Sequence, residues 1–388
     1  MKATGKSYVS KTVRDLKPSG IRRFFDLAAG MEGVISLGVG EPDFVTPWHV
    51  REAAIQSIEE GYTSYTPNAG LLELREEITN YVKNRFHVEY SPSEVIVTVG
   101  ASSAIDTAMR TILDPGDEVI VVEPCFVSYS PMVTLAGGVP VPVQALKEND
   151  FKILPSQIEA AITDKTKALM ICFPNNPTGT LLNKQELEAL AEIVKKYDLL
   201  VISDEIYAEL TYDETFTSMA SLPGMRERTI LVNGFSKAFA MTGWRLGFVC
   251  APEEISKEML KVHQYALMCA STNSQYAGIE ALRNGREDVE KMVKSYKLRR
   301  NFIVNSFNEM GLTCHMPGGA FYAFPSIEST GLSSQEFAER LLKEQSVAVV
   351  PGDVFGESGE GHIRCSYATS MEELKEAMIR IKRFIDSL

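Results

Sequence analysis

The chain has 388 residues, of which 45% are hydrophobic. This is enough apolar material for one very large domain or for two to three ordinary ones. The formal net charge of −12 argues against nucleic acid and anionic membranes as main partners.

Other general features favour a cytoplasmic protein. No apolar run is long enough to span a bilayer, and the first six residues lack the apolar region of a signal peptide. The six cysteines are scattered without a CxxC pair. This suits small buried side chains in a reducing compartment better than a disulfide framework.

The first 45 residues contain a helical pattern at 21–28, a short strand at 34–37 and a glycine-rich turn at 38–43. Gly38 and Gly40 let backbone N–H groups face a ligand, and a plain turn is an equally good interpretation. Thr46 is then predicted to cap a helix that begins at Pro47 and runs to Ile58. A tyrosine-rich loop over 62–70 and a second helix over 72–85 follow.

Strands and helices alternate from residue 95 onward. The predicted strands are 95–99, 118–122, 139–143, 168–173, 199–203, 230–233 and 246–250, with helices such as 184–197 between most of them. Nearly continuous apolar strands separated by helices indicate a mostly parallel sheet that is covered on both faces. The fold class is therefore predicted to be α/β.

The last part of the chain has a different pattern. Residues 253–284 and 286–310 form long helical patterns, and short strands at 319–324, 347–350 and 363–367 precede an amphipathic helix at 371–388. We predict a large domain over 46–285 and a smaller α+β domain over 286–388. The segment 1–45 is predicted to pack with the small domain.

Chemically useful groups follow five of the predicted strands. In order they are the turn Gly100-Ala101-Ser102, the ring of Phe126, the amide of Asn176, the carboxylate of Asp204 with the phenol of Tyr207, and the amine of Lys237. In a parallel sheet these strand ends share the edge at which ligands bind. A helix that starts with small residues is also an anion site.

Each of these features alone has an ordinary explanation as a turn, a helix cap, a core ring or a solvated lysine. Together they suit a planar, phosphorylated, cationic heterocycle that carries an aldehyde. A lysine forms the Schiff base, a carboxylate pairs with the pyridinium nitrogen, and polar groups orient the ring. This residue set indicates pyridoxal 5′-phosphate as the cofactor.

Five motifs make the pattern specific. They are SLGVGEPDF at 36–44, YTPNAG at 65–70, NNPTG at 175–179, SDEIY at 203–207 and SKAFAMTGWR at 236–245. With these motifs in order, essentially the whole chain resembles the class I/II aminotransferases of the aspartate aminotransferase fold, most of all the prokaryotic aspartate/aromatic aminotransferases. The resemblance implies a fold type I transferase, in which the large domain binds pyridoxal phosphate around a seven-stranded sheet.

The resemblance also implies roles for the residues that bind the cofactor. Lys237 matches the Schiff-base lysine, which also moves the proton between Cα and the cofactor. Asp204 matches the pyridinium partner, and Asn176 and Tyr207 match the partners of the ring oxygen. The phosphate cup and the stacking ring correspond to Arg245, Ser236, the backbone of Gly100, Ala101 and Ser102, and Phe126.

For the substrate, the resemblance implies that Arg364 grips the α-carboxylate as a bidentate fork and that Gly40 and Asn176 contact the substrate too. Tyr65 matches a tyrosine that reaches the phosphate of the neighbouring subunit, so a homodimer with shared active sites is expected. No metal site is expected.

One departure concerns the distal carboxylate of aspartate. The arginine that binds it in animal and enterobacterial aspartate aminotransferases falls in a segment that corresponds to 268–275, where this chain has no arginine. Strict dicarboxylate specificity is therefore in doubt, although other groups can recognise dicarboxylates.

The expected activity is transfer of an amino group from aspartate or an aromatic L-amino acid to a 2-oxo acid such as 2-oxoglutarate, in a ping-pong cycle. The alternative on the same fold is a carbon–sulfur β-lyase. A DNA-binding regulator that keeps this fold as a sensor is a third class. The acidic charge, and the lack of room for a DNA-binding head before residue 20, oppose that third class.

Overall fold

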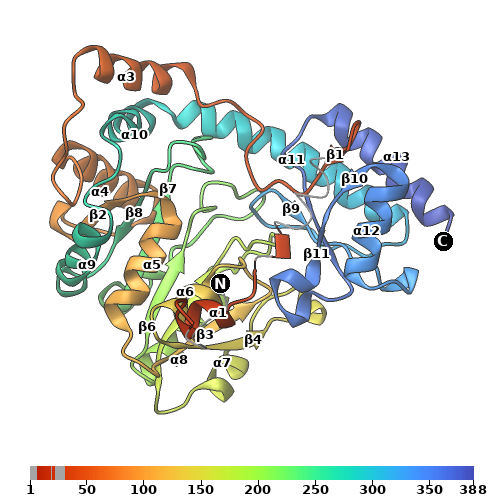
Figure 1. The fold of residues 1–388 in the computed structure, drawn as a ribbon, viewed down its shortest axis with the longest axis horizontal. Helices are drawn as coiled ribbons and strands as arrows, with labels where there is room; N and C mark the ends of the chain where they lie inside the picture. Colours follow the sequence, from red (N-terminus) through yellow and green to blue (C-terminus); the bar gives the residue numbers. More distant parts are fainter. Residues whose placement is uncertain (1–6, 19, 22–30) are drawn as a thin grey trace.

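The computed structural model describes residues 7–18, 20, 21 and 31–388. The helical pattern predicted at 21–28 lies, beyond Ile21, outside the described residues. Figure 1 shows two lobes side by side, a larger one built around a sheet and a smaller one formed mainly by the last part of the chain. Within the described residues, no helix combines the length and apolarity that a bilayer crossing needs.

The larger lobe contains the predicted seven-stranded sheet. Its strands are β2 (Val95–Thr98), β3 (Glu118–Glu123), β4 (Val139–Gln144), β5 (Thr166–Cys172), β6 (Leu200–Asp204), β7 (Thr229–Gly234) and β8 (Gly247–Cys250). Their order in space is β2-β8-β7-β6-β5-β3-β4. β8 runs antiparallel to both neighbours, and the other neighbouring pairs are parallel. The prediction of a mostly parallel sheet is thus confirmed.

Helices cover both faces of this sheet, which explains why the strands read as continuous apolar runs. Along β5, Met170 joins one hydrophobic cluster while its neighbours Leu169 and Ile171 join another on the opposite face. The helices of this lobe are α3 (Trp48–Glu59), α4 (Leu72–Phe86), α5 (Gly100–Ile112), α6 (Tyr129–Leu135), α7 (Pro155–Ala161), α8 (Lys184–Lys196), α9 (Glu253–Ala266) and α10 (Thr272–Asn284). Short 3-10 turns at Pro92–Glu94, Lys147–Asn149, Met219–Ser221 and Arg226–Arg228 complete it.

Two local predictions were wrong. The single helix predicted over 253–284 is two helices, because α9 ends at Ala266 and Met268 adopts a left-handed backbone conformation with φ 68°. Thr46 does not cap α3, whose N-cap is Pro47. The Thr46 hydroxyl instead donates to the carbonyl of Ala240 at 2.6 Å, a tertiary contact that sequence spacing does not reveal.

The smaller lobe is an α+β unit. α11 (Arg286–Glu309) runs from the larger lobe into it (Figure 1). Its other elements are β9 (Tyr322–Ala323), α12 (Ser334–Gln345), β10 (Val347–Ala348), β11 (Val350–Pro351), β12 (Ile363–Ser366), α13 (Met371–Asp386) and 3-10 turns at Glu328–Thr330, Gly352–Phe355 and Glu357–Gly359. β11, β12 and β9 form an antiparallel sheet.

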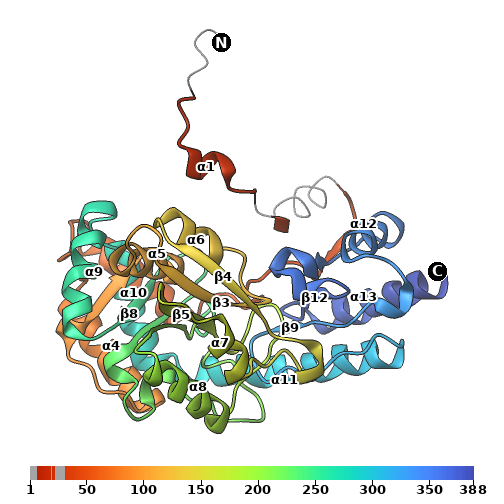
Figure 2. The ribbon, with the colours of Figure 1, turned by 90° about the horizontal axis from the view of Figure 1, so that it is seen from below.

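A segment near the start of the chain also contributes to the smaller lobe. β1 (Ile35–Ser36) pairs in parallel with β10, with Ile35 opposite Val347. The carbonyl of Leu37 then accepts a hydrogen bond from the amide of Ser366 in β12 at 2.6 Å. By contrast, α1 (Lys11–Asp15) has no buried residue and projects from the body in Figure 2. The domain limits at residues 45 and 285 stay a prediction.

Candidate active site

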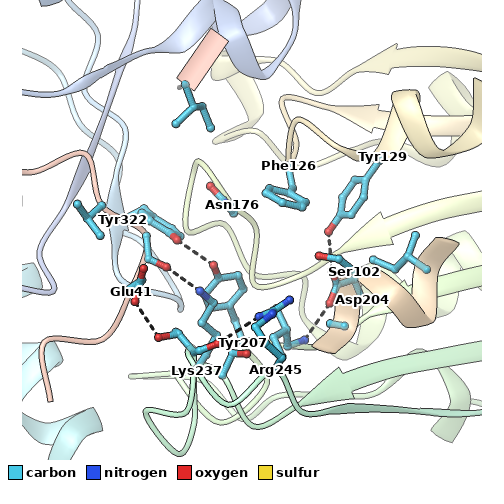
Figure 3. Close-up of a pocket in the computed structure, with 18 of the residues that line it drawn as sticks. Glu41, Ser102, Phe126, Tyr129, Asn176, Asp204, Tyr207, Lys237, Arg245 and Tyr322 are labelled. Carbon is cyan, nitrogen blue, oxygen red and sulfur yellow. Dashed lines mark hydrogen bonds between the residues drawn. The ribbon is translucent and has the colours of Figure 1, made fainter. Parts of the chain in front are cut away.

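A cavity of about 540 Å³ lies at the carboxyl ends of the sheet strands, where the two lobes meet. Of the residues predicted from sequence to form a site, its wall includes Gly40, Ala101, Ser102, Phe126, Asn176, Asp204, Tyr207, Ser236, Lys237, Arg245 and Arg364. These residues come from both lobes and from segments far apart in the chain. In Figure 3 the labelled side chains among them converge on one space, namely those of Ser102, Phe126, Asn176, Asp204, Tyr207, Lys237 and Arg245.

Asp204 lies at the end of β6 with a buried carboxylate. The Tyr129 hydroxyl donates to its Oδ2 at 2.7 Å and the amide of Ile206 donates to Oδ1 at 3.2 Å (Figure 3). Burial raises the pKa of Asp204 to about 6, although both hydrogen bonds and the charge of Lys237 act against this. A buried carboxylate without a salt-bridge partner among the described residues suits a cationic ligand group such as a pyridinium N–H.

Lys237 lies in the turn after β7 and points into the same cavity. Its Nζ donates to the carbonyl of Gly40 at 2.6 Å. Burial lowers the pKa of this amine to about 8, with Glu41 and Asp204 opposing the shift and Arg364 and Arg245 adding to it. A lowered pKa leaves more of the amine neutral near physiological pH, and the neutral amine is the form that attacks an aldehyde.

Arg364, in β12 of the smaller lobe, is a buried cation in this cavity. It donates from Nη1 to Oδ1 of Asn176 at 2.8 Å and from Nη2 to the carbonyl of Gly38 at 2.6 Å. Its buried Nε has no partner among the described residues. Burial lowers the pKa of Arg364. A buried guanidinium with a free donor and without a carboxylate partner suits an anionic ligand.

A second cationic corner lies at the start of α5. Gly100 has φ +77°, a backbone conformation that favours glycine, and a Cβ on it would lie 2.7 Å from Nη2 of Arg245, so the guanidinium packs directly against this backbone. Gly100 itself does not line the cavity, while its neighbours Ala101 and Ser102 do. A guanidinium beside a helix N-terminus is suited to a phosphate. The aldehyde, the ring nitrogen and the phosphate of pyridoxal phosphate would thus each find a chemically suitable group in this cavity, Lys237, Asp204 and Arg245 respectively.

Several wall residues were missed by the sequence analysis, notably Glu41, Tyr129, Thr242 and Tyr322. Tyr129 follows Phe126 by three residues, a spacing that could have indicated two rings at one rim. Tyr322 comes from β9 in the other lobe and carries no local signal. Tyr65 is 81% exposed and does not line the cavity of its own chain.

Comparison with known proteins agrees with this geometry. The family model for aminotransferase class I and II matches residues 32–381. A putative aminotransferase, YugH, of Bacillus subtilis is 64% identical over 98% of both chains. An aspartate aminotransferase of Pyrococcus abyssi is 50% identical over 95% of this chain and 96% of its own.

Among solved structures, an aromatic aminotransferase from Pyrococcus horikoshii superposes with a TM-score of 0.90 at 48% identity, covering 95% of this chain and 99% of its own. The family match spans nearly the whole chain, and fold and sequence agree with it. The chain therefore belongs to the class I and II aminotransferases, pyridoxal-phosphate-dependent enzymes of the aspartate aminotransferase fold.

Proposed function

We propose that this aminotransferase moves the amino group of an aromatic L-amino acid or of aspartate to a 2-oxo acid such as 2-oxoglutarate, in two half-reactions of a ping-pong cycle. The observation that carries the proposal is the cavity that Lys237, Asp204 and Arg364 share, in which a half-buried amine lies with a buried carboxylate and a buried guanidinium. When bound, pyridoxal phosphate supplies an aldehyde that takes up the amino group and a ring that draws electrons from Cα.

Residues of the larger lobe would hold the cofactor. Lys237 would hold its aldehyde end and would carry the proton of the substrate Cα. Asp204 would keep the ring nitrogen protonated, while Asn176 and Tyr207 would donate to the ring oxygen. Arg245, Ser236 and the backbone of Gly100, Ala101 and Ser102 would hold the phosphate, and Phe126 would provide the aromatic ring beside the cofactor ring.

The α-carboxylate of the substrate lies on Arg364, with Gly40 beside it. The free Nε of Arg364 and its planar fork support this role, because a carboxylate accepts two parallel hydrogen bonds from a guanidinium. Lys237 lies within hydrogen-bonding distance of the Gly40 carbonyl, so the proton carrier and the carboxylate clamp are adjacent.

The lining of the cavity favours aromatic donors over aspartate. It includes the apolar side chains of Val39 and Ile105, and each cation among the described lining residues already binds another group in this proposal, which leaves none for the distal carboxylate of aspartate. The segment 268–275 does not line this cavity. Its Ser271 and Ser274 line a neighbouring hollow instead.

We further propose a cytoplasmic homodimer in which Tyr65 of each chain reaches the phosphate in its partner. The side chain of Tyr65 is 81% exposed, as expected for an aromatic residue that a partner subunit covers. Tyr62, Leu267 and Met268 form further exposed apolar surface near it. Asn68 donates to the carbonyl of Met268 at 2.9 Å, which holds the two loops together. The cytoplasmic location is supported by six cysteines without disulfide bonds.

A half-reaction tests the activity. The purified protein is loaded with pyridoxal phosphate and mixed with one amino acid in the absence of an acceptor. Stoichiometric conversion of the cofactor to its pyridoxamine form, with release of one equivalent of 2-oxo acid, is expected. Steady release of pyruvate and ammonia would point to the β-lyase instead. A donor panel against 2-oxoglutarate, scored by kcat/KM, then ranks aromatic donors against aspartate.

A further inference from the structure

Tyr322 reaches the candidate site from the smaller lobe and takes no part in the cycle proposed above. It lies in β9, is fully buried and lines the cavity. Its hydroxyl oxygen is 2.8 Å from that of Tyr207, which belongs to the larger lobe (Figure 3). The two rings meet edge to face, with centroids 5.8 Å apart. A hydrogen bond between two phenols therefore joins the lobes inside the site.

The direction of this bond decides what Tyr207 can do. A phenol has one proton to donate and can also accept a hydrogen bond. If Tyr322 donates to Tyr207, the proton of Tyr207 is left free to point into the cavity toward a ring oxygen. Both side chains are buried, so bulk water cannot readily take the place of the partner.

The Tyr322 hydroxyl has little freedom to turn elsewhere. A Cβ on Gly40 would lie only 2.7 Å from its oxygen, so the backbone of Gly40 passes directly beside it. The same Gly40 carbonyl accepts from Lys237. Tyr322 is thus held between the segment that contacts Lys237 and the phenol of Tyr207.

The ring of Tyr322 also lies against Arg364, the residue proposed to bind the carboxylate. The Arg364 guanidinium carbon lies 4.6 Å from the centroid of the Tyr322 ring, a cation–π contact. Burial raises the pKa of the Tyr322 hydroxyl, and the charge of Arg364 opposes that rise. A carboxylate bound to Arg364 would offset this charge and so change the strength of Tyr322 as a donor.

We propose that Tyr322 is a positioning residue that aims the Tyr207 hydroxyl into the cavity and couples it to the occupancy of Arg364. Binding of a carboxylate at Arg364 is then felt at the cofactor through Tyr322, in addition to the direct bond between Arg364 and Asn176. The inference rests on the proposed roles of Tyr207 and Arg364.

The test uses the holoenzyme and the pH dependence of its cofactor absorbance, which reports protonation of the link between Lys237 and the cofactor. Each protein is titrated with and without hydrocinnamate, a carboxylate that lacks an amine and cannot react. In the wild type, the carboxylate should raise the pKa of the link, since it offsets a nearby positive charge. In Tyr322→Phe, which keeps the ring but loses the hydroxyl, the shift should fall by about half or more.

Two further variants separate positioning from a general structural effect. Tyr367→Phe removes another buried hydroxyl of the smaller lobe, one that contacts Tyr212 and Ala320 rather than the cavity, and it should leave the shift unchanged. Tyr322→Leu removes the ring below Arg364 as well, so it should also raise the KM for amino acids, whereas Tyr322→Phe should mainly lower kcat. The double variant Tyr207→Phe/Tyr322→Phe should lose little more shift than either single variant.

The coupling would be overturned if the carboxylate raised the pKa of the link in Tyr322→Phe as much as in the wild type. It would also be overturned if Tyr367→Phe lost as much of this pKa shift as Tyr322→Phe. Additive losses in the double variant would overturn it as well. Failure of the proposed function looks different, because the wild type itself would then fail to convert its cofactor with an amino acid alone.

Discussion

The Tyr129 hydroxyl donates a 2.7 Å hydrogen bond to Oδ2 of Asp204, so a neutral phenol stabilises the buried carboxylate. Tyr129 lies at the start of α6, and its ring packs edge to face against Phe126. One short segment thus supplies both a ring at the cavity wall and the donor that orients the carboxylate. This contact lowers the pKa of Asp204 against the effect of burial.

Replacement of Tyr129 by Phe should therefore raise the pKa of Asp204 above its value of about 6. Because only the ionised carboxylate attracts a pyridinium, cofactor affinity of the apoenzyme should fall by about tenfold near that pH and by less at higher pH. Equilibrium binding of pyridoxal phosphate across a pH series measures this. Tyr90→Phe, at a buried tyrosine whose hydroxyl has no partner among the described residues, is the matched control. If cofactor affinity falls off toward acid pH at the same pH in Tyr129→Phe as in the wild type, the prediction is wrong.

Lys237→Ala should abolish nearly all transamination, since no other amine lines the described cavity. The phosphate corner at Arg245 remains, so pyridoxal phosphate should still bind but should be removed by dialysis. Absorbance spectra before and after dialysis, beside turnover, check both parts. Turnover at the wild-type rate would show that Lys237 is not the essential amine.

The lowered pKa of Lys237 gives a separate prediction about pH. The rate at which the apoenzyme couples covalently to pyridoxal phosphate should rise with pH and level off above about 8, because the neutral amine is the nucleophile. Stopped-flow absorbance measures this rate. A midpoint near the ordinary lysine value, about 10.4, would mean that burial does not lower this pKa.

Arg364→Lys keeps the charge but loses the planar fork. Binding of amino acids and 2-oxo acids should weaken together by ~1.5–3 kcal/mol, with cofactor affinity almost unchanged. Steady-state KM values and cofactor titrations give the two readouts. Arg380→Lys, at a half-buried arginine of α13 that pairs with Glu376 and does not line the cavity, is the control. Loss of the cofactor with unchanged KM would instead place Arg364 at the phosphate.

Subunit mixing tests the role of Tyr65. Tyr65→Ala should weaken cofactor binding, and Lys237→Ala is inactive. If Tyr65 serves the partner's site, a heterodimer of the two variants contains one site with both residues intact. Mixing the inactive protein with an excess of Tyr65→Ala at limiting cofactor should then restore wild-type affinity to that site. No gain would mean that Tyr65 acts within its own chain or not at all.

The sequence predicts those parts of the site that follow directly from strand ends. Asp204 is the last residue of one apolar strand and Lys237 lies in the turn that follows another, so their places at one edge follow from the parallel sheet alone. Tyr322 could not be predicted in this way, because it reaches the cavity only through the packing of the smaller lobe. The prediction that Thr46 caps α3 was wrong for a related reason, because its hydroxyl donates to the carbonyl of the distant Ala240 rather than capping its own helix.

The same limit applies to the break between α9 and α10. Helical periodicity continues across residues 267–271, and the left-handed Met268 leaves no mark in that pattern. The contact of Asn68 with the Met268 carbonyl joins this break to a loop two hundred residues earlier, so tertiary structure decides where the helix ends.

The pairing of β1 with β10 joins two segments that the ribosome makes at very different times. Residues 35 and 36 leave the ribosome early, but their partners at 347 and 348 emerge only when almost the whole chain has been made. The sheet of the larger lobe, with Asp204 and Lys237, is complete well before that. Arg364 can meet its acceptor Gly38 only after residue 364 has been made. A nascent chain therefore contains the groups proposed to hold the cofactor before it contains the arginine proposed to bind the amino acid.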